Sequence, residues 1–129
     1  MSDPESRQAP LVGVVGPCFS GKSTLVAALQ ARGIHAREIA QEHSYAPAMW
    51  QRLTQPDVLI YLDVSAEEAR RRQRTVASDS LWEKQHRRLR HAYAHADLYL
   101  DTDELTPEEI LERVLRFLSE IDDVGAERS

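Results

Sequence analysis

The sequence predicts an α/β domain with three layers, in which helices cover both faces of a small, mostly parallel sheet of about four strands. Short apolar runs that suit buried strands alternate along the chain with segments of helical periodicity. A glycine-rich turn joins the first of these strands directly to the first helix. The chain has 129 residues, the length of one domain. We place that domain at residues 11–121, between flexible tails at residues 1–10 and 122–129.

Four segments account for the predicted strands. The clearest covers residues 58–62, all of which are apolar, as expected for a parallel strand that is buried on both faces. The other segments are residues 11–15, 34–39 and 97–100. The carboxyl ends of parallel strands meet at one edge of a sheet, and ligands of α/β proteins bind outside that edge. The residues that fall at or just beyond these ends are Gly16, Glu38, Asp63 and Asp101.

The predicted helices are marked by their ends. The helix that follows the glycine-rich turn carries an apolar stripe at residues 25–29 and ends at Gly33, a usual position for a C-terminal cap. A Ser or Thr followed three residues later by Glu forms a capping box, which marks the start of a helix. Capping boxes begin the helices predicted at residues 65–74, 80–95 and 106–121, and a short helix is predicted at residues 47–53.

Residues 16–24 read GPCFSGKST and match the pattern G-x-x-x-x-G-K-[ST]. The glycines of this pattern permit a tight loop whose N–H groups point inward and form a nest for an anion. The Lys22 ammonium can reach the β- and γ-phosphates of a nucleotide, and the Ser23 hydroxyl can bind Mg²⁺. A glycine turn without a chemical role, which is the alternative, has no need of this lysine and two hydroxyls. The predicted phosphate-binding residues are Gly16, Pro17, Cys18, Phe19, Ser20, Gly21, Lys22, Ser23 and Thr24.

Composition argues against several other classes of function. The net charge of −5 disfavours general binding to nucleic acid, which requires basic surfaces. No apolar stretch is long enough to cross a membrane, and we expect no signal peptide in the polar N-terminal residues. Cys18 is the single cysteine, which excludes an internal disulfide and suits a reducing compartment. We therefore expect a cytoplasmic protein that has neither nucleic acid nor a membrane as its partner.

Two further segments resemble the P-loop kinases of the nucleoside-monophosphate kinase type. Residues 58–68 read VLIYLDVSAEE and residues 70–74 read RRRQR, which is similar to a strand, a capped helix and the lid arginines of thymidylate kinases. Residues 96–103 read ADLYLDTD and are followed by TPEE, which resembles the last strand and helix of small-molecule P-loop kinases. Together with residues 16–24, the resemblance covers about two-thirds of the chain.

The resemblance implies a P-loop NTPase fold that binds ATP with Mg²⁺. It implies that Arg72 and Arg74 are lid arginines, whose guanidinium groups suit phosphate oxygens and the charge on a transferring phosphoryl group. The alternative for these arginines is a solvated helix face. The resemblance also implies that the backbone at Asp101 and Thr102 passes near the adenine, although Asp and Thr are common in simple turns as well.

The chain departs from this family between its second predicted strand and residue 58. Only about eighteen residues fill the stretch that in such kinases holds the acceptor-binding helices and a separate strand with the carboxylate that orients Mg²⁺. Asp63 is our candidate for this carboxylate, with Glu38 and Glu42 as alternatives. The other interpretation of Asp63 is that its charge only interacts with the dipole of the helix that follows. Glu42 and His43 are candidates to take a proton from an acceptor hydroxyl or from water, unless they form a solvated loop pair.

We therefore expect transfer of the γ-phosphoryl group of ATP to a small hydroxyl or phosphate acceptor. The alternative is a nucleotide-binding or slowly hydrolysing regulatory module that acts on a protein partner through an exposed apolar patch around Met49 and Trp50. A small GTPase is disfavoured, because guanine recognition in that family uses an N-K-x-D motif and the chain contains no asparagine. The expected catalytic residues are Lys22, Asp63, Arg72 and Arg74, and the expected metal ligands are Ser23 and Asp63.

Overall fold

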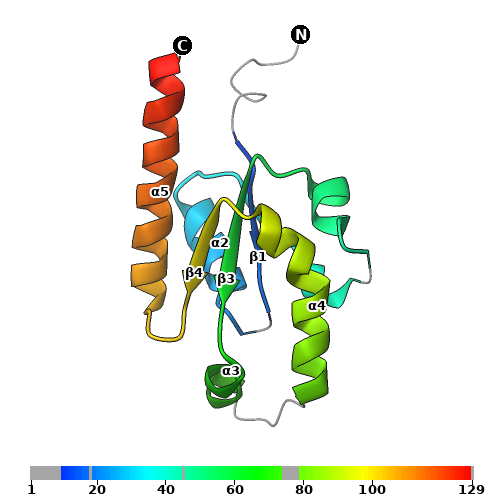
Figure 1. The fold of residues 1–129 in the computed structure, drawn as a ribbon. Coiled ribbons are helices and arrows are strands. Elements are labelled where there is room, and N and C mark those ends of the chain that lie inside the picture. Colours follow the sequence, from blue (N-terminus) through cyan, green and yellow to red (C-terminus); the bar gives the residue numbers. More distant parts are fainter. Residues whose placement is uncertain (1–9, 18, 45, 74–78, 129) are drawn as a thin grey trace.

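The computed structural model describes residues 10–17, 19–44, 46–73 and 79–128 (Figure 1). The strands within these residues are β1 (Val12–Val15), β2 (Ala36–Glu38), β3 (Val58–Asp63) and β4 (Leu98–Asp101). They form one sheet in the order β2-β1-β3-β4, and every pair of neighbouring strands is parallel. The predicted α/β class and the small parallel sheet are therefore confirmed.

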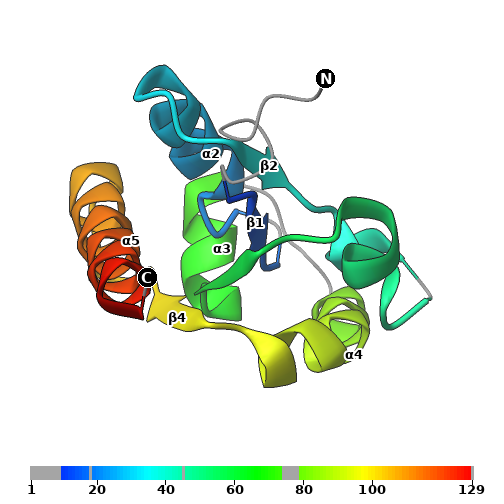
Figure 2. The same ribbon diagram turned by 90° about the horizontal axis from the view of Figure 1, so that it is seen from above.

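Helices cover both faces of this sheet. They are α2 (Lys22–Ala31), the 3₁₀-helix η1 (Gln41–His43), the π-helix η2 (Trp50–Thr54), α3 (Ala66–Gln73), α4 (Asp79–His95) and α5 (Pro107–Arg128). Helices α2 and α5 lie next to each other on one face, and α4 covers the opposite face (Figure 2). Among the described helices, none combines the length and the apolar character that crossing a membrane would require.

The core has two parts because the side chains of a strand alternate between the two faces of a sheet. Ile60 and Leu62 of β3 belong to the cluster beneath α2 and α5. Leu59 and Tyr61 belong to the cluster beneath α4, which also contains Trp50. Each fully buried side chain of this size stabilises the fold by roughly 1.5–3 kcal/mol. Strand β3 is thus buried on both sides, which explains why its residues 58–62 are all apolar.

Two helix ends follow their sequence signals closely. After α2, the N–H groups of Gly33 and Ile34 donate to carbonyl oxygens of the last helical turn, each at 3.0 Å, and Gly33 has a left-handed backbone with φ of 80°. Before α5, Thr106 Oγ1 accepts a hydrogen bond from the Glu109 N–H at 3.1 Å. The Glu109 carboxylate accepts one from the Thr106 N–H at 2.9 Å, which completes the predicted capping box.

The other two predicted capping boxes differ from expectation. At the start of α3, Ser65 Oγ accepts from the Glu68 N–H at 3.1 Å, but the Glu68 carboxylate pairs with Arg71. A carboxylate binds a guanidinium more strongly than a neutral N–H, so this part of the box is lost. The Ser65 N–H donates instead to Asp103 Oδ1 at 2.7 Å. Ser80 lies inside α4, and the prediction that it begins this helix is wrong by one residue.

Two helices differ from prediction in their extent. The short helix expected at residues 47–53 is the π-helix η2, which begins at Trp50. The Trp50 N–H donates to Gln41 Oε1 at 2.8 Å, and a donor that is used by a side chain cannot serve a regular helix. Helix α5 continues to Arg128 instead of ending near Ile121, so the tail predicted at residues 122–129 is helical as far as Arg128.

Candidate functional site

The chain turns sharply in the β1–α2 loop, residues 16–21. Gly16 follows β1 with φ of 153°, and a Cβ atom there would overlap the carbonyl oxygen of Leu62 in the neighbouring strand β3. Phe19 and Gly21 have left-handed backbones, with φ values of 68° and 99°. The glycines are therefore required by the path of the loop, at Gly16 by close packing and at Gly21 by the backbone conformation.

The Lys22 side chain folds back over this loop. Lys22 is the first residue of α2 and is only 5% exposed. Its Nζ donates to Gly16 O at 2.6 Å, to Pro17 O at 3.2 Å and to a Glu42 carboxylate oxygen at 2.6 Å. The ammonium thus lies beside the N-terminus of α2, where the loop N–H groups and the helix dipole favour an anion.

Ser20 places a buried hydroxyl within the same loop. The residue is completely buried, and its Oγ has no hydrogen-bond partner among the described residues. A buried hydroxyl without a partner costs about 1–3 kcal/mol. A ligand with acceptor oxygens would remove this cost, so Ser20 favours a polar ligand at the loop.

Ser23 and Glu38 bring a hydroxyl and a carboxylate together next to the loop. Ser23 Oγ donates to Glu38 Oε2 at 2.7 Å, and both residues are exposed. Glu38 is the last residue of β2 and therefore lies at the carboxyl edge of the sheet, as predicted. Mg²⁺ commonly binds one or two protein oxygens together with waters and phosphates, and this pair fits that requirement.

Asp63, the other predicted metal ligand, is held by a different set of groups. Asp63 Oδ2 accepts a hydrogen bond from the Tyr99 hydroxyl at 2.6 Å. Asp63 Oδ1 accepts one from the Val64 N–H at 2.9 Å and lies 3.6 Å from His86 Nε2. Burial alone would raise the pKa of Asp63, but these neighbouring donors hold the pKa below its usual value. The contact with Asp63 in turn raises the pKa of His86.

The two predicted metal ligands therefore contact opposite edges of the sheet. Ser23 pairs with Glu38 of the edge strand β2, whereas Asp63 pairs with Tyr99 of the edge strand β4. In the described part of the chain, no three His, Cys, Asp or Glu side chains are grouped so as to hold a metal. A Mg²⁺ ion at this loop would depend on Ser23, on Glu38 and on oxygens of the ligand itself.

Arg72 connects three segments around the loop. From α3, its guanidinium donates to Phe19 O at 2.7 Å and to Thr102 O at 2.6 Å. Thr102 follows β4 and is completely buried, and its N–H and hydroxyl both donate to Asp63 O at 2.8 Å. The structure thus places Arg72, one of the two predicted lid arginines, in contact with the predicted phosphate-binding residues at the Phe19 backbone oxygen.

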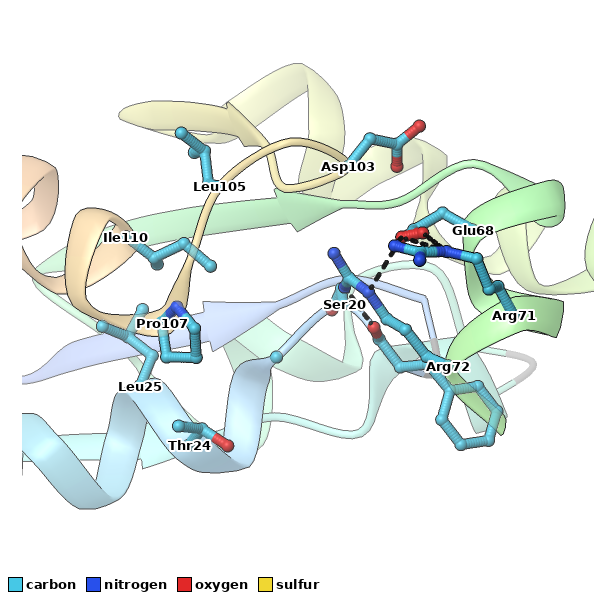
Figure 3. A pocket seen from close by; sticks show the side chains of 12 residues that line it. Ser20, Thr24, Leu25, Glu68, Arg71, Arg72, Asp103, Leu105, Pro107 and Ile110 are labelled. Atoms are coloured by element: carbon cyan, nitrogen blue, oxygen red, sulfur yellow. Dashed lines mark hydrogen bonds and ion pairs between the residues drawn. The ribbon is translucent and has the colours of Figure 1, made fainter. Parts of the chain in front are cut away.

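A cavity of about 400 Å³ lies beside the loop, between α2, α3 and the turn that follows β4 (Figure 3). Arg72 reaches from its polar side to the loop, whereas the neighbouring Arg71 pairs with Glu68 of its own helix. The volume is within the range of small-molecule sites, which combine apolar walls with a few polar groups. The side chains that line it are Phe19, Ser20, Thr24, Leu25, Glu68, Arg71, Arg72, Asp103, Leu105, Pro107 and Ile110.

Glu42 lies closer to the loop than the sequence suggests. It is only 3% exposed, and its carboxylate contacts Lys22 at 2.6 Å. The interpretation of Glu42 as part of a solvated loop pair is therefore wrong. Helix η1, which carries Glu42, is held against α4, where Arg88 donates to the backbone oxygen of Glu42 at 3.2 Å. The side chain of His43 lies outside the part of the chain that the structure describes.

The remaining predicted residues have simpler surroundings. Asp101 Oδ1 accepts a hydrogen bond from the Asp103 N–H at 3.0 Å, which is the turn that was its alternative interpretation. Thr24 is exposed and lines the cavity. Cys18 and Arg74 lie outside the described residues.

Sequence reasoning missed the apolar wall of the cavity and the groups around Asp63. A signal for the wall was available, because the apolar face of the last helix starts at Ile110, directly after the turn that contains Leu105. The contacts of Asp63 with Tyr99 and His86 had no local signal, since the three side chains come from β3, β4 and α4.

No protein-family model matches this chain, and no curated protein sequence matches it significantly. Any inference about a ligand therefore rests on the chemistry of the β1–α2 loop and of the side chains around it.

Proposed function

We propose that this chain is a P-loop NTPase that binds ATP with Mg²⁺ and transfers the γ-phosphoryl group to a small hydroxyl or phosphate acceptor. The observation that carries the proposal is the buried Lys22 ammonium at the N-terminus of α2, held against a loop with left-handed residues. Loop N–H groups, a helix dipole and a lysine together favour phosphate. The buried Ser20 hydroxyl adds one more polar group at the same loop.

The groups next to the loop suit the metal and the charge of such a nucleotide. Ser23 and Glu38 would hold Mg²⁺, directly or through water, because their oxygens already lie together. The bound metal would neutralise part of the phosphate charge. Arg72 would stabilise the transferring phosphoryl group, since its guanidinium already reaches the loop.

The cavity beside the loop is the proposed site of the nucleoside. Leu105 and Ile110 give it an apolar wall, and the Arg72 guanidinium can stack on a base. We propose adenine because the resemblance favours it and because the chain lacks the asparagine that guanine recognition requires in GTPases. The turn at Asp101 and Thr102 ends next to this cavity, at Asp103.

Asp63 is proposed to orient the acceptor. Because hydrogen bonds hold its pKa below the usual value, Asp63 stays ionised near neutral pH and would accept a hydrogen bond from an acceptor hydroxyl. A carboxylate of this kind is a weak base, but phosphoryl transfer has a loose transition state and depends mainly on positioning and charge. Lys22 and Arg72 supply the charge, and Asp63 supplies the positioning.

Nucleotide binding is the first test of this function. Isothermal titration with non-hydrolysable analogues of ATP and GTP, each with and without Mg²⁺, should give micromolar, Mg²⁺-dependent binding of the ATP analogue. Lys22→Met keeps most of the side-chain volume but removes the charge, so affinity should fall by about a hundredfold. Turnover with any acceptor that is found should disappear in the same variant.

Lys84→Met is the matched control, because Lys84 is the only other lysine and lies exposed on α4. It should bind the ATP analogue like the wild type. Circular dichroism of both variants would establish that they are folded. A Lys22→Met protein that is folded and still binds the analogue with wild-type affinity would rule out the proposed role of the loop.

The regulatory-module alternative has lost part of its basis. It required an exposed apolar patch at Met49 and Trp50, but Trp50 is 5% exposed and Met49 is packed against the same core cluster. A screen of small hydroxyl and phosphate acceptors with labelled ATP separates the two functions. Nucleotide binding without a phosphorylated acceptor would favour the module.

A further inference from the structure

Another cavity, of about 370 Å³, opens on the surface of helix α4. Its lining residues are Glu83, His86, Arg87 and Arg90, whose spacing places them on one face of the helix. Arginine is always charged in proteins, and His86 adds a positive charge when it is protonated. Glu83 is the single carboxylate among these lining residues, so positive charge predominates in the cavity. The α4 cavity therefore suits an anion, in a protein whose net charge is −5.

The two arginines of the α4 cavity are available to a ligand. Arg87 and Arg90 are exposed, and neither forms a hydrogen bond or an ion pair with another described residue. The arginines of α3 are different, because Arg71 pairs with Glu68 and Arg72 donates to the backbone of the β1–α2 loop. Guanidinium groups bind phosphate oxygens in pairs, so two of them in one cavity favour a phosphate.

His86 connects the α4 cavity with Asp63. Since a carbonyl oxygen can only accept, the contact of His86 Nδ1 with Trp82 O at 3.0 Å places a proton on Nδ1. The other ring nitrogen, Nε2, lies 3.6 Å from Asp63 Oδ1. This contact raises the pKa of His86 and so increases its positive charge near neutral pH. The ring therefore lines the cavity and also contacts the carboxylate that is proposed to orient the acceptor.

Asp63 lies at the same edge of the sheet as the β1–α2 loop. Strands β1 and β3 are parallel neighbours, and Asp63 is the last residue of β3. The loop passes so close to this strand end that a Cβ atom at Gly16 would overlap the carbonyl oxygen of Leu62, the residue before Asp63. A molecule that extends from the α4 cavity to Asp63 would thus end near the proposed site of the γ-phosphate.

We propose that the α4 cavity anchors the acceptor, and that the acceptor is a small hydroxyl compound that also carries a phosphate group. The phosphate group binds Arg87 and Arg90, and a hydroxyl of the same molecule extends past His86 to Asp63. The inference rests on the proposed function, because it assumes transfer from ATP bound at the β1–α2 loop. It deepens that function by naming the substrate class and the residues that select it.

Charge favours a phosphate group over a carboxylate at this anchor. A phosphate monoester carries about −1.5 to −2 charges near neutral pH and has three acceptor oxygens, whereas a carboxylate has one charge and two oxygens. Two guanidinium groups and the partly protonated His86 balance the larger charge. Asp63 contacts His86 but is not among the lining residues, so its carboxylate does not face the bound phosphate directly.

Proton NMR of the histidine Hε1 resonances tests the anchor. The probes are glycerol phosphate, glycerate and glycerol, which all carry hydroxyl groups and differ in charge. At about pH 7, where a phosphate monoester is mostly a dianion, glycerol phosphate should shift the His86 resonance with millimolar affinity. Glycerate should bind at least about fivefold more weakly, and glycerol should cause no shift. The spectrum of His86→Gln assigns the resonance.

Variants of the two arginines locate the site of the probe. Arg87→Gln and Arg90→Gln should each bind glycerol phosphate about fivefold to tenfold more weakly, because each loses charged hydrogen bonds. Arg116→Gln is the matched control, since it removes one positive charge from an exposed position on α5, and it should bind like the wild type. In Lys22→Met the His86 shift should persist, because the probe is not held by the loop.

A screen with labelled ATP connects the anchor with the transfer. Each acceptor is offered as a hydroxyl compound and as its phosphate monoester, beginning with glycerol and glycerol phosphate. The monoester should have a KM at least about tenfold lower than the unphosphorylated compound. Arg90→Gln should raise the KM for the monoester by the factor that is measured for binding, and it should leave the KM for ATP unchanged.

The possible failures are distinguishable. If the wild type binds the ATP analogue but glycerol phosphate leaves the His86 resonance unchanged, the anchor is wrong and the proposed function stands. The same holds if folded Arg87→Gln and Arg90→Gln bind glycerol phosphate as tightly as Arg116→Gln. Equal KM values for phosphorylated and unphosphorylated acceptors would overturn the substrate class. If the wild type does not bind the ATP analogue, the proposed function is wrong and the assignment of the cavity to an acceptor falls with it.

Discussion

The loss of stability caused by replacing a glycine with a positive φ value depends on what surrounds that residue, as Gly16 and Gly33 illustrate. A Cβ atom at Gly16 would overlap the Leu62 carbonyl oxygen, whereas nothing lies within 4 Å of a Cβ atom at Gly33. We expect Gly16→Ala to lower the free energy of unfolding by about 3 kcal/mol or more, because β1 and β3 must move apart. Gly33→Ala should cost only about 1–2 kcal/mol, the backbone term alone. Urea unfolding of both variants measures the difference, and equal losses would contradict the predicted overlap.

A second prediction for a single residue concerns His86, which should make the stability of the protein depend on pH. The contact with the Asp63 carboxylate at 3.6 Å raises the pKa of His86, so protonated His86 stabilises the folded protein. This stabilisation is fully present below about pH 6.5, the pKa of histidine in the unfolded chain. It is lost as the pH rises through the higher pKa of His86 in the folded protein. Between about pH 6 and 8, the wild type should therefore lose more stability than His86→Gln, by less than about 1 kcal/mol because His86 is partly exposed.

The measurement is urea unfolding across this pH range. His95→Gln is the control, because the ring nitrogen of His95 faces the His91 backbone oxygen and not Asp63. It should keep the additional pH dependence that His86→Gln removes. The lowered pKa of Asp63 adds stability that is present above its unfolded pKa of about 3.9 and is lost only at more acidic pH, outside this window. Identical pH profiles for wild type and His86→Gln would refute the prediction.

At the scale of elements, one amide holds η1, η2 and α4 together. Gln41 accepts the Trp50 N–H and donates to the backbone oxygens of Ala46 and Arg88. Gln41→Leu keeps a similar volume but leaves these buried groups unsatisfied, and should cost about 2–4 kcal/mol. Thermal and urea unfolding measure this loss. Gln51→Leu, on the exposed side of η2, should be within about 0.5 kcal/mol of the wild type.

The emission of Trp50 gives a second measurement for Gln41→Leu. Trp50 is buried beside Gln41, so release of η2 should expose its ring and shift the emission to longer wavelength. The second tryptophan, Trp82, lies on α4 and provides a background that the Gln51→Leu control corrects. A Gln41→Leu protein with unchanged stability and emission would mean that η1 is held by other contacts.

Across the whole molecule, the sequence predicted those features that local patterns record. Strand β3 is buried on both faces from Val58 to Leu62, so these residues are all apolar. Gly33 and Thr106 mark helix ends because their backbone or side chain completes the hydrogen bonds of the adjoining turn. Gly16 and Gly21 were predictable because the path of the β1–α2 loop requires them, whereas the binding of phosphate by this loop stays a prediction.

Features that depend on distant contacts could not be predicted in this way. The start of η2 is set by a side chain nine residues earlier, and the partner of Lys22 lies twenty residues later in the chain. Asp63 and Tyr99 are 36 residues apart and meet only because β3 and β4 are neighbours in the sheet. Polar residues of these types are common in many sequences, and only the folded structure shows which partner each of them contacts.

The direction of α5 has a practical consequence for attachment to a surface. The helix starts at Pro107, beside the cavity, and its 22 residues carry the chain about 33 Å back along the sheet. Strand β1 also starts at that distant end (Figure 1). A tag or biotin placed beyond either end of residues 11–128 would therefore tether the protein with the β1–α2 loop directed away from the support. If the protein binds nucleotide as proposed, the immobilised protein should accordingly bind it as freely as protein in solution.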